Sequence, residues 1–195
     1  MTTEKTDHQE YIELFPYIQK YQALATKYNI KDIFQDNGGK YLQLLMVLEL
    51  TTNGAREGND AVDKEGNEYE IKTVNLDLQR SFSTHHHMNP TIIAKYRRVD
   101  WLFAPFLGID LQVIYRVKPE AMEHYYTLWE TKWHASKGKD INNPKVPLKF
   151  VMQHGQQVWI RDDLEVFTVP KLKKDPNRVI VPRKKKDKNL LLMPL

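Results

Sequence analysis

The stretch Glu57-Gly-Asn-Asp-Ala-Val-Asp-Lys-Glu-Gly-Asn-Glu-Tyr-Glu-Ile-Lys72 holds acids and an amine that one hairpin can bring together. Gly66 and Asn67 are typical turn residues between two short alternating segments, so Asp60 lies on one strand and Glu70 on the other. Since side chains alternate between the two faces of a strand, Glu70 and Lys72 share a face. The pattern predicts two carboxylates and one amine on the same surface.

Such a set suits phosphodiester chemistry. Two carboxylates are hard oxygen ligands for Mg²⁺, which keeps its remaining positions for water and phosphate oxygens. A metal ion held by Asp60 and Glu70 would polarise a phosphate and activate water. Lys72 would orient that water or take its proton, and would stabilise negative charge on phosphorus. The plainer alternative is that charges alternating along a hairpin are only its solvated face.

Composition limits the class of protein. The 195 residues fit one domain, and 41% apolar residues are enough for a packed core. No segment is apolar for long enough to cross a bilayer and the polar start has no signal-peptide character, so we expect a soluble intracellular protein. The chain has no cysteine, which excludes disulfides and thiolate zinc sites. Any metal ion must therefore be held by oxygen or imidazole.

The net charge of +4 is unevenly distributed. Residues 160–195 hold ten Lys and Arg against five Asp and Glu, whereas residues 1–159 hold nineteen against twenty. A duplex-binding protein usually has a basic surface, so the near-neutral first part argues mildly against DNA binding. A dimer can still line one cleft with lysines while its acids lie elsewhere.

The apolar pattern predicts alternating helices and strands. Residues 7–28 have helical spacing and form an amphipathic arm that Pro16 kinks or divides. The aromatic residues of a helix opening at Pro119 are expected to be core and not a base-stacking platform. The fold class is α/β (α+β), one domain with a mixed central sheet flanked by helices. Two further helices are expected at 41–50, after a Gly38-Gly39 break, and at 90–98. Strands are expected at 101–107 and 111–117. A last hairpin is expected from 150–152 and 158–160, and an edge strand at 164–169.

From Ile33 to Lys145 the chain resembles the PvuII-type restriction endonucleases, members of the nuclease superfamily named for its Pro-Asp, Asp/Glu-x-Lys signature. Asn59 replaces the proline, as it does within this subgroup. The resemblance is far more specific than the two acids and the lysine alone. It rests on Asp-Ile-Phe-Gln-Asp-Asn-Gly-Gly-Lys at 32–40, Arg-Glu-Gly-Asn-Asp-Ala-Val-Asp at 56–63, Phe-Ser-Thr-His-His-His-Met-Asn-Pro at 82–90, Ile-Ile-Ala-Lys-Tyr-Arg at 92–97 and Lys-Asp-Ile-Asn-Asn-Pro-Lys at 139–145.

The resemblance implies a type II restriction endonuclease that cuts both DNA strands at a short palindrome, with one or two Mg²⁺ ions per active site. It implies Asp60, Glu70 and Lys72 as catalytic residues, the two acids being metal ligands. Glu57 and Glu68 are close enough in sequence to be outer ligands. The implied base readers are His86 and His87 for guanine and Asn143 for adenine, and the other implied DNA contacts are Asp36, Ser83, His85, Asn142 and Tyr96.

The implied readers have ordinary alternatives. Imidazole suits the acceptors of guanine, and an amide pairs with adenine. A histidine triplet can equally be a weak metal site or a solvated loop, and Asn-Asn-Pro is a common turn. Tyr96 can equally be an internal helix residue.

The resemblance also implies an oligomeric state, a DNA site and a partner enzyme. A palindrome is read by two subunits related by a twofold axis, so we expect a homodimer. The resembled specificity is CAGCTG with a blunt central cut, and a cognate DNA methyltransferase protects the genome of a prokaryotic host, in whose cytoplasm the enzyme acts. We expect an endonuclease domain at 1–159, with a dimerisation arm at 7–35 and a catalytic and recognition core at 36–159.

Residues 160–195 depart from the resembled pattern, and they form a basic extension of unknown role. Its basic cluster at 183–188 could contact non-specific duplex in a salt-sensitive way, or it could be a solvated end. Two other functions remain open for the whole chain. One is a DNA-binding module without catalysis, and the other is a repair nuclease or resolvase that recognises DNA structure.

Overall fold

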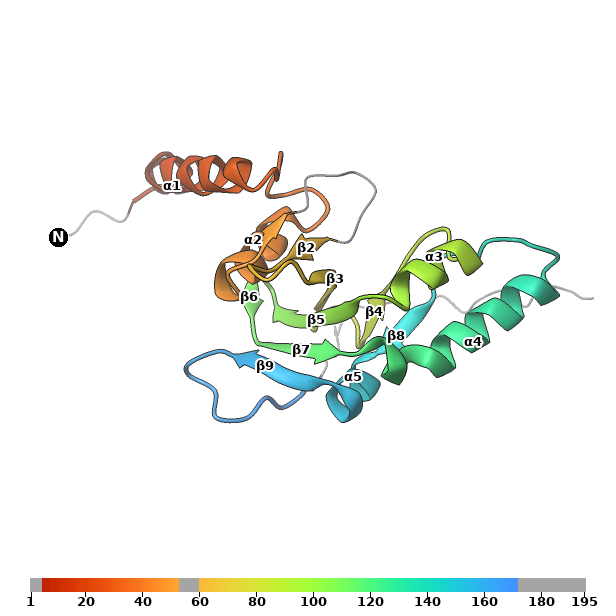
Figure 1. Ribbon diagram of the computed structural model, residues 1–195. Helices are drawn as coiled ribbons and strands as arrows, with labels where there is room; N and C mark the ends of the chain where they lie inside the picture. The colour runs from red at the N-terminus through yellow and green to blue at the C-terminus, as the bar shows by residue number, and fades with distance from the viewer. Residues whose placement is uncertain (1–4, 53–59, 172–195) are drawn as a thin grey trace, which may run out of the picture.

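The computed structural model describes residues 5–52 and 60–171 of the chain. Over these ranges the elements gather around one mixed sheet (Figure 1). The predicted class, a single α/β domain with a mixed sheet and flanking helices, is confirmed. The helices are α1 (Asp7–Lys27), α2 (Gly38–Val47), α3 (Pro90–Tyr96), α4 (Pro119–Ala135) and α5 (Leu148–His154). The strands are β1 (Thr51–Thr52), β2 (Ala61–Val62), β3 (Glu68–Asn75), β4 (Ser81–Ser83), β5 (Asp100–Leu107), β6 (Asp110–Leu111), β7 (Val113–Val117), β8 (Lys145–Pro147) and β9 (Gln156–Ile160).

Strand β3, which carries Glu70 and Lys72, lies inside the main sheet. The strand order is β1-β2-β3-β5-β7-β9, with β6 paired to β5. β3 runs antiparallel to β2 and parallel to β5, where Glu70 lies opposite Trp101 and Lys72 opposite Phe103. The predicted central pair of strands is confirmed as β5 and β7, which run antiparallel. Because both neighbours of β3 hold it by backbone hydrogen bonds, its side chains have fixed positions.

Both faces of the sheet are buried, so β5 divides its side chains between two cores. Trp101 and Phe103 belong to a cluster with residues of α3, α4 and α5. Leu102, Ala104 and Phe106 belong to a second cluster, with residues of α2 and the end of α1. Helices covering both faces explain why β5 is almost wholly apolar. The aromatic face of α4 belongs to the first core, as predicted.

A second sheet pairs β4 with β8, which are far apart in the sequence. The two strands are antiparallel, and Phe82 lies opposite Val146. Both side chains are fully buried, which attaches this small sheet to the first core. Beyond it, Met88 and Ile141 form an isolated antiparallel bridge. The histidine triplet and the asparagine pair therefore lie on neighbouring segments.

Three predicted elements differ from the observed ones. The Gly38-Gly39 pair opens α2 instead of preceding it. The strand expected at 150–152 is wrong, because these residues belong to α5, whose Leu148 and Val151 are buried at helical spacing. The edge strand expected at 164–169 is also wrong, since this segment forms no ladder. Short apolar runs do not distinguish a strand from a buried helical turn.

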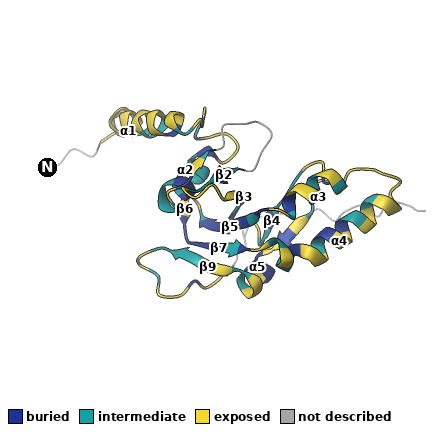
Figure 2. Cartoon of the chain, in the orientation of Figure 1, coloured by how far each residue is buried: buried dark blue, intermediate teal, exposed yellow. Residues whose placement is uncertain are grey.

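Helix α1 is confirmed at its predicted place, and Pro16 lies inside it without dividing it. Thr6 and Gln9 form a capping box at its start, which satisfies free backbone N–H groups. Ala25 is the buried residue of this helix, and Figure 2 draws most of its length as exposed. The exposed apolar side chains are Tyr11, Ile12, Leu14, Phe15, Tyr17 and Leu24.

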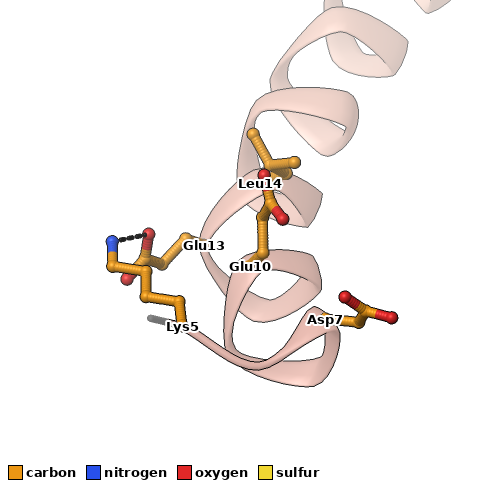
Figure 3. A pocket seen from close by; sticks show the side chains of 5 residues that line it. All are labelled: Lys5, Asp7, Glu10, Glu13 and Leu14. Carbon is orange, nitrogen blue, oxygen red and sulfur yellow. Dashed lines mark hydrogen bonds and ion pairs between the residues drawn. The ribbon is translucent and has the colours of Figure 1, made fainter. Parts of the chain in front are cut away.

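A shallow hollow occurs at the beginning of α1 (Figure 3). Within it, Lys5 forms an ion pair with Glu13 at 2.7 Å. The hollow contains no residue predicted to contact DNA or metal, so it is a surface feature of the arm. Its lining residues are Lys5, Asp7, Glu10, Glu13 and Leu14.

Gly38 is required for close packing at the start of α2. A Cβ atom there would lie 2.5 Å from Asp32 O and 2.8 Å from Ile30 Cγ2, whereas the nearest atom to a Cβ on Gly39 is 3.3 Å away. We expect Gly38→Ala to lower the free energy of unfolding by about 1–3 kcal/mol through overpacking. The matched Gly39→Ala should change it by less than about 1 kcal/mol. Urea unfolding measures both variants, and equal effects would contradict this role of Gly38.

Candidate active site

The predicted hairpin brings Asp60, Glu70 and Lys72 together. β2 and β3 pair with Ala61 opposite Tyr69, and Asp60 directly precedes β2. The Asp60 carboxylate accepts a hydrogen bond from the Ile71 backbone N–H through Oδ2 at 2.8 Å. It is therefore bound to the same strand that carries Glu70 and Lys72. The Asp60 carbonyl also accepts a hydrogen bond from the Tyr41 hydroxyl of α2.

Glu70 is buried, with 5% of its surface exposed. Its Oε1 accepts hydrogen bonds from Lys72 Nζ and, at 3.0 Å, from the Tyr96 hydroxyl. The alternative of a solvated hairpin face is wrong for this residue. Burial raises the pKa of Glu70; the Lys72 ammonium opposes this rise, and the nearby Asp60 carboxylate adds to it. A buried acid with two donors and a second acid beside it is typical of a functional site.

Tyr96 is fixed by a network behind the site. The Tyr126 hydroxyl donates to the Tyr96 carbonyl at 3.1 Å and accepts from Trp101 Nε1 at 2.8 Å. The Tyr96 and Trp101 rings also meet edge to face, 4.6 Å apart. Burial, and next the Glu70 carboxylate, raise the pKa of Tyr96 strongly, so this phenol is a hydrogen-bond donor at neutral pH. Tyr96 is thus held against Glu70 from three sides.

Arg97 holds the end of α3 on α4. Its guanidinium group forms paired hydrogen bonds with Glu123, at 2.7 and 3.0 Å, and with Glu130, at 2.6 and 2.8 Å. Such two-pronged pairs are the strong form of ion pair. Arg97 lowers the pKa of both carboxyl groups. Because Arg97 follows Tyr96 directly, this cluster also positions the phenol.

His85 lies between the carboxylates and the reader loops. Its ring centre is 6.5 Å from that of Tyr96, and burial, followed by the charge of Lys72, lowers its pKa. The imidazole is therefore neutral at pH 7. Its Nδ1 accepts a hydrogen bond from the His87 backbone N–H at 3.0 Å, so the proton is on Nε2. His85 thus presents an N–H donor with its other nitrogen already occupied.

The other predicted readers form one cluster above the small sheet. His86 Nδ1 lies 3.3 Å from Asn142 Oδ1, and the Asn143 N–H donates to the His85 carbonyl at 2.9 Å. Ser83 accepts a hydrogen bond from Lys145. Asn143 has a left-handed backbone with φ of 51°, and within the described residues its buried Oδ1 has no hydrogen-bond partner. The Asn143 backbone is therefore held by His85, while its side-chain oxygen is a hydrogen-bond acceptor without a partner among the described residues.

Asp140 supports this cluster, and sequence reasoning did not single it out. Its carboxylate accepts weak hydrogen bonds from Asn89 Nδ2 and Trp133 Nε1, at 3.4 and 3.3 Å, and lies 3.7 Å from His87 Nδ1. It therefore joins the His loop to the end of α4. Its position two residues before the asparagine pair is the sequence feature that could have indicated this supporting role.

The remaining predicted residues lie outside this cluster or outside the described ranges. Asp36 is exposed in the turn before α2, with φ of 47°, and no described contact joins it to the carboxylates. Glu68 is an exposed residue at the start of β3. Glu57 lies outside the described residues.

The donor chemistry suits a divalent cation. Asp60 and Glu70 supply two carboxylates, and a hard cation can complete its coordination with water and phosphate oxygens. Both donors to Glu70 meet Oε1, so a cation bound through Oε2 need not displace them. Within residues 5–52 and 60–171, no group of three His, Cys, Asp or Glu residues could hold a metal ion by protein ligands alone. Asp60 and Glu70 are thus the residues that could hold such a cation.

The chain matches a known protein family over most of its length. Residues 6–159 of the chain match the family model described as Restriction endonuclease PvuII. The matched range begins just before α1 and ends inside β9, so it includes both carboxylates and both reader loops. The extension that follows residue 159 lies outside the match.

The Arg97 cluster predicts a pH-dependent contribution to stability. Glu123 and Glu130 have lowered pKa values in the folded state, so their contribution is present above the unfolded pKa of 4.5 and is lost as the pH falls. We expect Arg97→Met to lower the free energy of unfolding by about 1–2 kcal/mol at pH 7, with the difference from the parent shrinking below pH 4.5. Urea unfolding at several pH values tests this, with exposed Arg98→Met as the control. A difference that does not change with pH would contradict it.

Proposed function

Because this chain belongs to the restriction endonuclease PvuII family and is a type II site-specific deoxyribonuclease, we propose that it cuts DNA with Asp60, Glu70 and Lys72. The observation that carries the proposal is the buried Glu70 carboxylate, held by Lys72 next to Asp60. A structural acid gains little from such burial, because removing a carboxylate from water is costly. A catalytic acid gains a fixed position.

Restriction endonucleases typically need a divalent metal ion. We propose Mg²⁺, one or two ions per active site, with Asp60 and Glu70 as the protein ligands. The bound cation would supply a polarised phosphate and an activated water. Asp60 is fixed through Oδ2 by the Ile71 N–H and would bind the cation through its other oxygen. Tyr96 keeps the Glu70 carboxylate from rotating by holding Oε1.

Lys72 acts on the attacking water and on the phosphate. Its ammonium group is largely buried, with 15% of the side chain exposed, so its charge is weakly screened. From this position it orients the water by a hydrogen bond and stabilises the negative charge that develops on phosphorus. The adjacent His85 carries no competing charge at pH 7, because its pKa is lowered.

Sequence reading is assigned to the loops beside the small sheet. We propose that His86 and His87 contact guanine and that Asn143 contacts adenine, within the site CAGCTG, which is cut at its centre to leave blunt ends. The unpartnered Asn143 Oδ1 supports this, because the adenine N6 amino group is a donor. Ser83, His85, Asn142, Asp36 and Tyr96 are proposed to make the remaining DNA contacts. A methyltransferase of the same specificity would protect the host.

A homodimer is proposed from the symmetry of the site and from α1. One subunit carries one set of readers, so a palindrome needs two subunits related by a twofold axis. The exposed apolar side chains of α1 support a second copy as the partner of this helix, because contiguous apolar surface of this kind marks interfaces. We also propose an endonuclease domain at 1–159 and an extension at 160–195, a division supported by the family match over residues 6–159.

Cleavage by single-residue variants tests the proposed chemistry. On a plasmid with one CAGCTG site and Mg²⁺, we expect blunt linear product from the parent. Asp60→Ala, Glu70→Ala and Lys72→Ala should each reduce the cleavage rate at least about 1,000-fold while the dimer remains folded. Lys64→Ala is the matched control, because Lys64 lies on the same hairpin with 72% of its side chain exposed.

End-mapping of the fragments decides between functions. Blunt ends at the site support the proposal. Nicks that depend on DNA structure would support a repair nuclease, and binding without cutting would support a non-catalytic module. Wild-type rates in Lys72→Ala would remove the amine from the mechanism.

Charge placed on α1 tests the dimer. Tyr11 and Phe15 stack with their ring centres 5.4 Å apart on the exposed face. We expect Phe15→Glu to give monomers in analytical ultracentrifugation without loss of helical content, since burying an unpaired carboxylate in an interface is costly. Lys20→Glu places a carboxylate at an exposed position about 140° around the helix from Phe15 and should leave the dimer intact. A Phe15→Glu dimer of unchanged affinity would exclude this face as the interface.

A further inference from the structure

The described part of the extension is fixed to the protein core. After β9 the chain turns back on itself (Figure 1), and residues 161–171 form no helix or strand. Phe167 is nevertheless only 5% exposed, and it belongs to the cluster that includes Phe82 of β4 and Val146 of β8. Its neighbour Val166 is 72% exposed. A single aromatic side chain therefore anchors this segment in the core, beyond the end of the family match.

Arg80 adds a polar anchor at the base of the same sheet. Its Nη2 donates to the Pro170 carbonyl at 2.6 Å, and its Nη1 donates to the Leu76 carbonyl. The Arg80 carbonyl accepts from the Leu148 N–H at 2.9 Å. Arg80 directly precedes β4, and Leu148 directly follows β8. One residue thus joins the extension to the outer ends of both strands of the small sheet.

The small sheet needs such support. β4 and β8 have three residues each, so their backbone pairing alone gives at most marginal stability. The position of the sheet therefore depends on the buried side chains that attach it to the first core, namely Phe82, Val146 and Phe167. Its strands continue into the segments that carry His86 and Asn143, which are joined through the Asn143 to His85 hydrogen bond. Any tilt of this sheet moves both reader segments relative to the main sheet. Base discrimination depends on hydrogen-bond geometry, which tolerates little displacement.

We propose that residues 161–171 are a brace that positions the base-reading loops, so that the extension contributes to sequence discrimination. The proposal rests on the proposed reading role of the histidines and of Asn143. Phe167 and Arg80 act in it as positioning residues, since they hold the sheet and touch no base.

The ratio of specific to non-specific DNA affinity tests the brace. Fluorescence anisotropy, with Ca²⁺ in place of Mg²⁺, measures binding to a CAGCTG duplex and to a scrambled duplex of equal length. We expect Phe167→Ala to lower this ratio by about tenfold, through weaker specific binding. Val166→Ala, next to it and exposed, should leave the ratio unchanged. A loss of folded protein changes both affinities equally and leaves the ratio as it was.

Three further variants separate the possible causes of a lower affinity ratio in Phe167→Ala. Phe167→Leu keeps an apolar side chain in the core and should retain most of the ratio of specific to non-specific affinity. Deletion of residues 172–195 keeps both anchors and should retain it fully, while a loss there would contradict the brace by assigning discrimination to later residues. If Phe167→Ala does not fold, Arg80→Gln decides, with the same expected fall.

The outcomes distinguish the brace from the proposed base-reading role on which it rests. An unchanged ratio in folded Phe167→Ala, or in Arg80→Gln, overturns the brace while the assigned readers remain. A parent protein that binds both duplexes equally overturns the proposed reading of CAGCTG itself.

Discussion

The proposed active site depends on keeping one carboxylate out of water. Glu70 lies on an interior strand, and its burial is tolerated because Lys72 and Tyr96 both donate to it. Each donor imposes a further requirement. Lys72 must share a face of β3 with Glu70, and Tyr96 must be held at the end of α3 by Tyr126 and by the Arg97 cluster. β3 and the α3–α4 contact thus supply the two donors that the buried carboxylate requires.

The short helix α3 connects the proposed base-reading loop to the proposed catalytic site. The His loop leads directly into α3, whose N-cap Asn89 is also a donor to Asp140. Seven residues later the same helix ends at Tyr96, against Glu70. A helix of this length spans roughly 10 Å and transmits position without much bending. The arrangement gives the DNA-reading loop a direct mechanical link to the carboxylate, which suits an enzyme that must not cut before its site is read.

The sequence predicted those features that depend on local patterns. The hairpin followed from Gly66-Asn67 and from strand alternation, because turn chemistry and side-chain direction are local. The meeting of Tyr96 with Glu70 depends on the packing of α3, so only the family resemblance could suggest it. Asp140 was missed for the same reason, and Tyr126 was predicted as a core residue but not as a hydrogen-bond partner of Tyr96. The α5 error came from a short apolar run whose period is ambiguous. The burial of Phe167 left no local signal, because the adjacent Val166 is also apolar and yet exposed.

A crystal structure of the dimer on a CAGCTG duplex, grown with Ca²⁺ to prevent cutting, tests the central claim most directly. The account predicts a cation bound by oxygens of Asp60 and Glu70 at roughly 2.3–2.6 Å, in contact with the phosphate at the centre of the site. Lys72 should lie beside that phosphate. Carboxylates remote from every phosphate, in a complex whose bases are read by the histidine loop, would contradict it.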